Sequence, residues 1–284
     1  MAIIEVRGLS YRYPQALDLQ PPALQEIDLT IEAGQIAVLA GATGSGKTTL
    51  CLTLNGMIPH LVGGDLSGEV RIDGTDTSQI APADLADVVG MVYQDADSQL
   101  LSASAAEEVA FGLENLGLDR QEISDRTSWV LDAVGLHDHW HVPPAQLSGG
   151  QKARLTIACA LARRPRVLIL DEALTSLDPA GREALLQLLR DINRQQGTTV
   201  LMTVNKLDQE LALANRLILI ESGRLLAQGE PRELLSDPAL WSTFSAPTLV
   251  QLAWQLRKQL PALQPADWLD VAQAERDLRG GLHA

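Results

Sequence analysis

The sequence is poor in cysteine, in basic residues and in long hydrophobic runs, and each shortage argues against a class of protein. Only Cys51 and Cys159 occur in 284 residues, far apart and without metal-ligand spacing. We interpret both as small buried side chains in a reducing cytoplasm. Lysine and arginine number 22 against 36 acidic residues, which gives a net charge of −14. That balance argues against a nucleic-acid partner, because such a partner requires a basic surface.

No apolar run approaches the roughly 20 residues that a membrane-spanning helix needs. The N-terminal stretch MAIIEVRGLS also lacks the charged-then-apolar pattern of a secretion signal. Hydrophobic residues nevertheless make up 46% of the chain, which is typical of a folded protein with a substantial core. His137, His139 and His141 crowd together in HDHWH, where a metal site is one interpretation. Their alternate spacing in a Pro-flanked loop is more typical of solvated side chains.

Two kinds of strand pattern occur. Residues 3–8 and 26–32 alternate apolar and polar side chains, as half-buried antiparallel strands do. Residues 35–41, 166–171, 198–204 and 216–222 are apolar runs, separated after Ser148 by segments that we predict to be helices, one of them between the last two runs. This alternation predicts an α/β fold with a parallel sheet covered on both faces. Residues 223–229 then read as a hairpin strand.

We predict two parts of unequal size. Residues 1–235 form the large domain, which contains a mostly helical insertion at about 95–150. The remainder, residues 236–284, has its own Trp241, Trp254 and Trp268 and several prolines, and reads as a small helical extension.

A phosphate-binding loop is the strongest motif. GATGSGKT, residues 41–48, follows a buried strand and opens a helix, which is the context that makes the motif credible. Its backbone N–H groups can surround phosphate oxygens, Lys47 can reach the β- and γ-phosphates, and the Thr48 hydroxyl can bind Mg²⁺. The predicted nucleotide-binding residues here are Gly41, Ala42, Thr43, Gly44, Ser45, Gly46, Lys47, Thr48 and Thr49.

RVLILDE, residues 166–172, supplies two acids at a strand end. Asp171 is placed to hold Mg²⁺ through water. Glu172, one residue later, is placed to orient and deprotonate the attacking water. Together with the loop, these residues predict Mg²⁺–nucleotide binding followed by hydrolysis.

A second anion-binding turn precedes the predicted helix after residue 148. LSGGQ places Ser148, Gly149, Gly150 and Gln151 at a helix start, where backbone N–H groups and a hydroxyl face outward. One nucleotide site hardly needs two such cradles. The second makes sense if it closes over a nucleotide held by another subunit.

LSGGQ together with GATGSGKT and VLILDE resembles the ATP-binding cassette (ABC) ATPase family over about residues 3–235. The resemblance implies a P-loop NTPase fold with a RecA-like parallel core, an antiparallel β subdomain and a helical subdomain. It also implies a head-to-tail dimer that sandwiches two ATP molecules, each with Mg²⁺. By the same resemblance, Tyr13 (with Tyr11 as its rival) stacks on adenine, Gln94 reaches Mg²⁺ and the attacking water, and Asp178 belongs to a loop that crosses the dimer interface.

Asn205 stands where the family has its switch histidine, in LMTVNKLD. An amide can donate a hydrogen bond but cannot become cationic or exchange a proton at neutral pH. We therefore interpret Asn205 as a degenerate switch; the alternative is a one-residue misalignment, although no histidine lies nearby to replace it.

Residues 94–118 resemble the ATPases of energy-coupling factor (ECF) transporters, which import vitamins and transition-metal ions. The matching residues are Asp97, Gln99, Glu107, Glu108, Phe111, Glu114 and Asn115, while Asp95, Ala96, Ser98 and Leu113 depart from the pattern. The resemblance implies a transmembrane scaffold subunit and a substrate-binding membrane subunit, with this chain on the cytoplasmic face of the membrane. Asp97, Glu107 and Glu108 can receive an arginine from the scaffold, or they form a solvated helix face.

The missing histidine favours a heterodimer with a second ABC ATPase, a homodimer being the alternative, and APTLVQLAWQL in the extension is similar to the segment that holds such dimers. Three other interpretations stay open: an ATPase of another ABC transporter type, a nucleotide-binding regulatory subunit of low turnover, and an ABC protein acting on DNA or ribosomes. The strongly acidic single cassette disfavours the last. The transported substrate and the partner ATPase are not encoded here.

Overall fold

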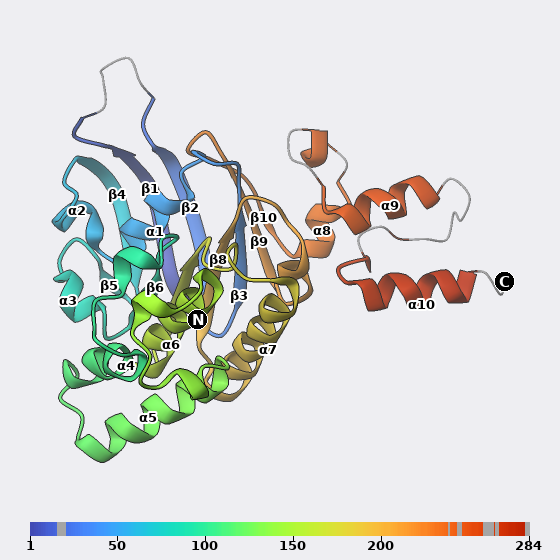
Figure 1. The fold of residues 1–284 in the computed structure, drawn as a ribbon. Coiled ribbons are helices and arrows are strands. Elements are labelled where there is room, and N and C mark those ends of the chain that lie inside the picture. The colour runs from blue at the N-terminus through green and yellow to red at the C-terminus, as the bar shows by residue number, and fades with distance from the viewer. Residues whose placement is uncertain (16–20, 238, 243–245, 258–263, 265–266, 282–284) are drawn as a thin grey trace.

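Two β-sheets form the centre of the computed structural model, which describes residues 1–15, 21–237, 239–242, 246–257, 264 and 267–281 (Figure 1). The antiparallel sheet has the order β2-β1-β4-β5 and consists of β1 (Ala2–Arg12), β2 (Leu24–Glu32), β4 (Asp65–Ile72) and β5 (Thr75–Asp76). The second sheet has the order β10-β9-β3-β8-β7-β6 and consists of β3 (Ile36–Ala40), β6 (Val89–Val92), β7 (Val167–Asp171), β8 (Thr199–Val204), β9 (Arg216–Glu221) and β10 (Arg224–Gly229).

The apolar runs form parallel strands because both faces of the second sheet are covered. β3, β6, β7, β8 and β9 are parallel, and β10 pairs antiparallel with β9 as the hairpin pattern predicted. Successive side chains of β3 alternate between two cores: Val38 packs towards the helices and Leu39 towards the antiparallel sheet, and neither is exposed. The predicted α/β class is confirmed.

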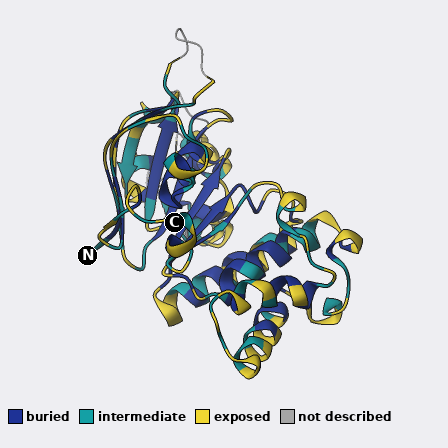
Figure 2. Cartoon of the chain, turned by 90° about the vertical axis from the view of Figure 1, so that its left-hand side faces the viewer, coloured by how far each residue is buried: buried dark blue, intermediate teal, exposed yellow. Residues whose placement is uncertain are grey.

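Ten α-helices form in the described part of the chain, and at least four of them begin at a side-chain cap. They are α1 (Lys47–Leu54), α2 (Met57–His60), α3 (Pro82–Leu85), α4 (Ala105–Glu114), α5 (Arg120–Ala133), α6 (Gly149–Ala162), α7 (Pro179–Gln196), α8 (Pro231–Leu235), α9 (Thr248–Leu256) and α10 (Val271–Gly281). Side-chain oxygens of Ser104, Asp119, Ser148 and Asp178 accept backbone N–H groups at the starts of α4, α5, α6 and α7. In Figure 2, α4, α5 and α6 form a lobe beside the sheets.

The predicted helix between β8 and β9 is wrong. Only the 3₁₀ turn Gln209–Ala212 forms there. The carboxylate of Glu210 in this turn is fully buried and paired with the guanidinium of Arg182 on α7. That contact fixes the short connection against α7, and Asn215 then accepts a hydrogen bond from the Ile36 N–H (2.9 Å), which returns the chain to the sheet.

The C-terminal residues divide between two clusters. Trp241 and Val250 are buried in the main core, whereas Trp268, Ala253 and Ala274 form a cluster of their own. Figure 1 shows α9 and α10 projecting from the body beyond α8. Part of the predicted extension 236–284 lies outside the described residues.

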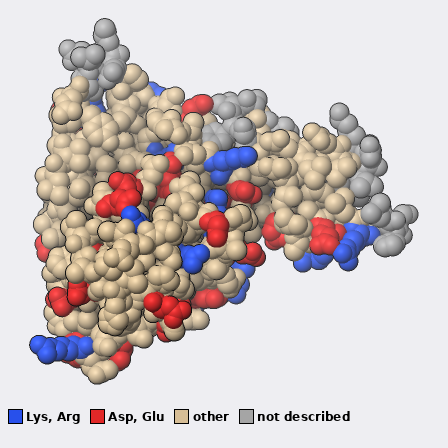
Figure 3. All heavy atoms as spheres, in the orientation of Figure 1, with Lys and Arg blue, Asp and Glu red and all other residues tan. Residues whose placement is uncertain are grey.

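The distribution of charged side chains and the polarity of the helices agree with what the composition indicates. Acidic and basic side chains are interspersed on the face drawn in Figure 3. Within the described part of the chain, none of the helices combines the length and apolarity needed to cross a lipid bilayer.

The two cysteines differ in their exposure to solvent. Cys51 is buried as predicted; Cys159 is only partly buried and lines a cleft. Burial raises the pKa of both thiols, so both stay protonated at neutral pH.

Trp241 offers a test of how firmly residue 241 belongs to the main core. Its side chain is 8% exposed and its Nε1–H donates to the Leu234 carbonyl (3.1 Å). Trp241→Ala is expected to lower the free energy of unfolding by about 3 kcal/mol, because it leaves a cavity in the core. Trp129→Ala, at a position 37% exposed on α5, is the control and is expected to lower it by less, because a smaller part of the ring is buried. Urea denaturation of the full chain measures both; equal shifts in the two variants would contradict this placement.

Candidate functional site

The loop between β3 and α1 is a tight turn with no space for a side chain at two of its glycines. A Cβ atom at Gly41 would lie 2.4 Å from Ser45 Oγ and 2.6 Å from the Ile220 carbonyl oxygen. Gly46 has a φ of 108°, and a Cβ atom there would lie 2.8 Å from the Ala23 carbonyl oxygen. The middle of the loop is exposed to solvent: Ala42, Thr43 and Gly44.

Two buried polar groups of this loop lie close together: an ammonium held by carbonyl oxygens and a hydroxyl that the described residues leave without a partner. Lys47 is 3% exposed, and its Nζ donates to the carbonyl oxygens of Gly41 (2.7 Å) and Ala42 (3.1 Å). The buried Ser45 Oγ has no hydrogen-bond partner among the described residues. A phosphate oxygen would satisfy the hydroxyl and could also accept a hydrogen bond from the ammonium. The loop therefore fits a phosphate group.

The two residues after Lys47 point in different directions. Thr48, the predicted Mg²⁺ ligand, is exposed, whereas Thr49 is buried and its hydroxyl lies 3.1 Å from that of Tyr13. Tyr13 is partly exposed. Tyr11, its rival for adenine stacking, is 1% exposed and donates its hydroxyl to the Gly63 carbonyl (2.7 Å). Of the two rings, Tyr13 is the one with surface left for a base.

The predicted acids lie at the end of β7 and are held by a residue of β8. Asp171 is 1% exposed, and its Oδ1 accepts a hydrogen bond from Thr203 Oγ1 (2.7 Å). The same Thr203 oxygen accepts the Glu172 N–H (2.9 Å). Glu172 has a φ of 51°, a left-handed conformation that costs about 1 kcal/mol or more for a residue with a Cβ. Thr203 thus fixes both the side chain of one acid and the backbone of the next.

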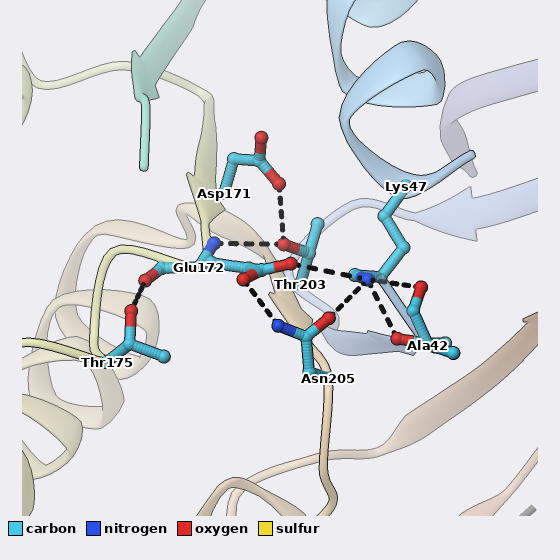
Figure 4. A network of polar contacts seen from close by, with 8 residues as sticks. Ala42, Lys47, Asp171, Glu172, Thr175, Thr203 and Asn205 are labelled. Carbon is cyan, nitrogen blue, oxygen red and sulfur yellow. Dashed lines mark hydrogen bonds and ion pairs between the residues drawn. The ribbon is translucent and has the colours of Figure 1, made fainter. Parts of the chain in front are cut away.

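Asn205 bridges the phosphate loop and the acid pair (Figure 4). Its Nδ2 donates to Glu172 Oε2 (2.6 Å), and its Oδ1 accepts from Lys47 Nζ (2.8 Å). Lys47 Nζ also lies 3.3 Å from Glu172 Oε1, and the two side chains are 3% and 8% exposed. The three side chains close a ring in which every donor faces an acceptor. The predicted switch position therefore contacts the predicted catalytic acid, Glu172, and the predicted phosphate-binding residue, Lys47.

The second group of predicted residues assembles around the start of α6. Ser148 is exposed and forms a capping box with Gln151, while Gly150 would place a Cβ 3.5 Å from the Ser176 carbonyl oxygen. Asp178 caps α7 through the Gly181 N–H (2.7 Å). Among the described residues, none of this group hydrogen-bonds to the ring of Lys47, Glu172 and Asn205. Gln94 is exposed at the end of β6 and also stands outside that ring.

The acids predicted to receive an arginine have unequal surroundings. Glu108 is buried, and its Oε2 already accepts two backbone N–H groups, those of Leu101 (2.8 Å) and Ser102 (2.6 Å), so it holds the loop before α4. Asp97 forms an ion pair with Lys152 on α6. Glu107 is exposed. Of the two interpretations of these acids, the solvated helix face does not hold for Glu108, which is buried and holds the loop.

A cleft of about 310 Å³ lies beside these acids, between the end of the second sheet and the helical lobe; its lining includes Met91, Tyr93, Glu108, Phe111, Cys159 and Arg163. Arg163 spans the two parts, donating to the carbonyl oxygens of Gly112 on α4 and Ala86 (both 3.1 Å). Phe111 is 61% exposed at the cleft.

Thr203 was not predicted as a site residue, and Gln99 was predicted only as part of the ECF resemblance. β8 contains two threonines, and Thr203 is the one that pairs with Asp171 of β7. This register is fixed by the sheet, so no local pattern in the sequence indicates the role of Thr203. Gln99 accepts the Tyr93 N–H through Oε1 (3.1 Å) and donates to the carbonyl of Asp95 (2.7 Å), which shapes the segment containing Gln94.

The model of the ABC transporter family matches residues 24–175. A putative ABC transporter ATP-binding protein of Pyrococcus abyssi is 39% identical over 261 residues, which cover 91% of this chain and 92% of that protein. The energy-coupling factor transporter ATP-binding protein EcfA1 of Latilactobacillus sakei is 39% identical over 235 residues, 82% of this chain and 80% of that protein.

Solved structures agree with these relatives. The structure of cbiO1 from Clostridium perfringens, described as part of the ABC transporter complex cbiONQ, has a TM-score of 0.74 at 29% identity and covers 92% of this chain and 96% of its own. A dimeric ATP-binding cassette in a post-hydrolysis state with ADP and phosphate has a TM-score of 0.71 at 25% identity, covering 80% and 98%. Because the family model spans more than half of the chain and these relatives match it over most of their length, the chain belongs to the ABC transporter ATPases and is an ATP hydrolase.

Proposed function

We propose that this chain is the ATP-binding and hydrolysing subunit of an ECF-type importer, in which closure of an ATPase dimer drives uptake of a vitamin or a transition-metal ion through separate membrane subunits. The chain acts at the cytoplasmic face of the membrane as a peripheral subunit. The observation that carries the proposal is the ring formed by Lys47, Glu172 and Asn205, found in a chain 39% identical to EcfA1.

The ring supports ATP hydrolysis through the groups that it brings together. The open loop and Lys47 bind the β- and γ-phosphates, and Glu172 orients and deprotonates the attacking water. Thr48, Gln94 and Asp171 would hold Mg²⁺, which supplies neutralising charge to the phosphates. When a γ-phosphate pairs with Lys47, Glu172 keeps only its hydrogen bond with Asn205. The other oxygen of the Glu172 carboxylate is then free to bind the attacking water.

The signature residues support a head-to-tail dimer. Ser148 Oγ accepts the Gln151 N–H (3.3 Å), so its own hydroxyl hydrogen remains able to donate to a phosphate across the interface. Asp178 and the C-terminal extension belong to the same interface. Since Asn205 equips this chain's own site poorly, whereas its signature residues are intact, the second ATPase is a different chain with a complete site.

The cleft beside α4 supports docking of the transmembrane scaffold. Exposed Phe111 gives an apolar anchor, and exposed Glu107 gives a carboxylate for a basic side chain of the scaffold. Co-purification of the native complex, with mass spectrometry of its subunits and bound small molecule, identifies the partners and the substrate class.

Glu172→Gln tests whether this chain hydrolyses ATP itself. In a reconstituted complex whose second ATPase carries a neutralised catalytic carboxylate, the remaining turnover reports on this chain alone. The substitution is expected to lower that turnover at least about 100-fold, because the general base is lost. Glu183→Gln, at an exposed acid on α7, is the control and should leave it unchanged. If the background complex shows no turnover above its Lys47→Ala form, a purely regulatory nucleotide-binding subunit replaces the proposal.

Asn205→His tests the degenerate switch in the same background. A histidine can donate to the γ-phosphate and exchange a proton, so turnover is expected to rise by about 10²-fold. Asn205→Ala, which removes both hydrogen bonds of the amide, is expected to lower it. Unchanged turnover in the histidine variant would show that the amide does not limit this site.

Phe111→Ala tests the docking cleft. Loss of the exposed ring is expected to weaken binding of the scaffold subunit by about ten-fold, measured as its retention on the immobilised ATPase dimer in detergent. Leu226→Ala on β10, where the side chain is 40% exposed, is the apolar control. Equal retention of the scaffold by both variants would place the docking surface elsewhere.

A further inference from the structure

His139 contacts the signature motif from outside it. It ends the 3₁₀ turn His137–His139, and its Nε2 lies 2.8 Å from Nε2 of Gln151 in the first turn of α6. Gln151 is also half of the capping box, in which its Oε1 accepts the Ser148 N–H (2.9 Å) and its own N–H donates to Ser148 Oγ (3.3 Å).

The protonation state of His139 follows from these contacts. A backbone N–H only donates, so the group that faces Ser148 N must be the amide oxygen of Gln151. The NH₂ group of Gln151 therefore faces His139 and donates, and His139 Nε2 must accept. The ring is then neutral with its proton on Nδ1, an atom that is buried and has no hydrogen-bond partner among the described residues.

We propose that His139 is a positioning residue of the signature motif: when neutral, it holds the Gln151 amide in the orientation that caps Ser148. This role rests on the proposed function in one respect, namely that Ser148 completes the nucleotide site of a second subunit. Protonation places an N–H on Nε2, opposite the NH₂ of Gln151. Two donors then face each other, and the amide must turn its oxygen to His139 and release the Ser148 N–H.

The sign of the pH dependence follows directly. The cap is intact while His139 is neutral, and it is lost when the ring takes up a proton at lower pH.

Neighbouring charges have other partners. On the same turn, His137 lies 2.8 Å from Asp138 and 3.9 Å from Asp132 of α5. On α6, Lys152 pairs with Asp97, and Arg154 lies 3.9 Å from Asp178. In the described part of the chain, no carboxylate oxygen lies within 4 Å of a ring nitrogen of His139. A proton on His139 therefore meets no carboxylate partner among these residues, and it acts on the signature motif through the contact with Gln151.

Nitrogen-15 NMR of the full chain tests the hydrogen bonds without a partner subunit. Between about pH 8 and pH 5, the Gln151 NH₂ resonances of the wild type should shift, and the Ser148 amide should lose protection against exchange by about five-fold, the equivalent of one helix cap. His139→Gln supplies an acceptor that cannot titrate, so in this variant the Gln151 NH₂ resonances and the protection of the Ser148 amide should not change with pH. His137→Gln is the control and should behave as the wild type does. The proposal is overturned if Gln151 and Ser148 do not respond to pH in the wild type, or respond equally in His139→Gln.

The assembled complex shows whether the switch reaches catalysis. At about pH 5.5, the wild-type kcat/KM for ATP should fall about five-fold below that of the His139→Gln complex, and the two should agree at high pH. His139→Phe, which removes the acceptor, should lower it by the same factor at every pH. If the NMR switch is present but the pH profiles coincide, His139 still positions Gln151, and the proposed role of Ser148 at a second subunit's nucleotide is what fails.

Discussion

A buried ammonium that must be neutralised is the constraint on which the nucleotide site depends. Lys47 is 3% exposed, and the carbonyl oxygens of Gly41 and Ala42 alone leave its charge unpaired. Glu172 supplies the opposite charge at 3.3 Å, and Asn205 hydrogen-bonds to both. A buried pair of this kind is costly to break on one side only, because the remaining charge is left in a low-dielectric site. In the proposed ATP-bound state, a phosphate oxygen pairs with Lys47, and Glu172 keeps its hydrogen bond with the Asn205 amide.

Parallel pairing brings these groups together from distant parts of the sequence. β3, β8 and β7 are neighbours, with Ala40 opposite Val204 and Asp171 opposite Thr203. The residues that follow the three strands consequently emerge at one edge of the sheet, where the carboxyl ends of parallel strands form ligand sites. The register also decides that a threonine, rather than an apolar side chain, faces the acids. A one-residue slip of β8 would turn the Thr203 hydroxyl to the other face and leave Asp171 without its buried hydrogen bond.

Features that depend on local sequence could be predicted, whereas features that depend on contacts between distant residues could not. Apolar runs bounded by glycines were enough to predict the strands, the phosphate loop and the capped helices. These features depend on residues that are neighbours in the chain. The helix expected after β8 does not form because Arg182 pins Glu210 in a short crossover, a contact between distant residues. Glu108 read as one more acid on a helix, yet it is buried beneath the loop that it caps. Nothing in the spacing of HDHWH shows that His139 meets Gln151.

The Asn205 amide is well matched to its two partners, Lys47 and Glu172, and less well matched to the catalytic role proposed for this position. The amide offers one donor and one acceptor at once, and the structure uses both, with Nδ2 on Glu172 and Oδ1 on Lys47. A protonated histidine at this position would bring a second cation beside the buried ammonium, which a low dielectric penalises. The amide avoids that penalty, but it cannot carry positive charge towards a γ-phosphate. Under the proposed function, the residue that closes the ring with Lys47 and Glu172 is thus a weak catalyst, and a dimer gains a complete site when this chain contributes Ser148 to a partner that has the histidine.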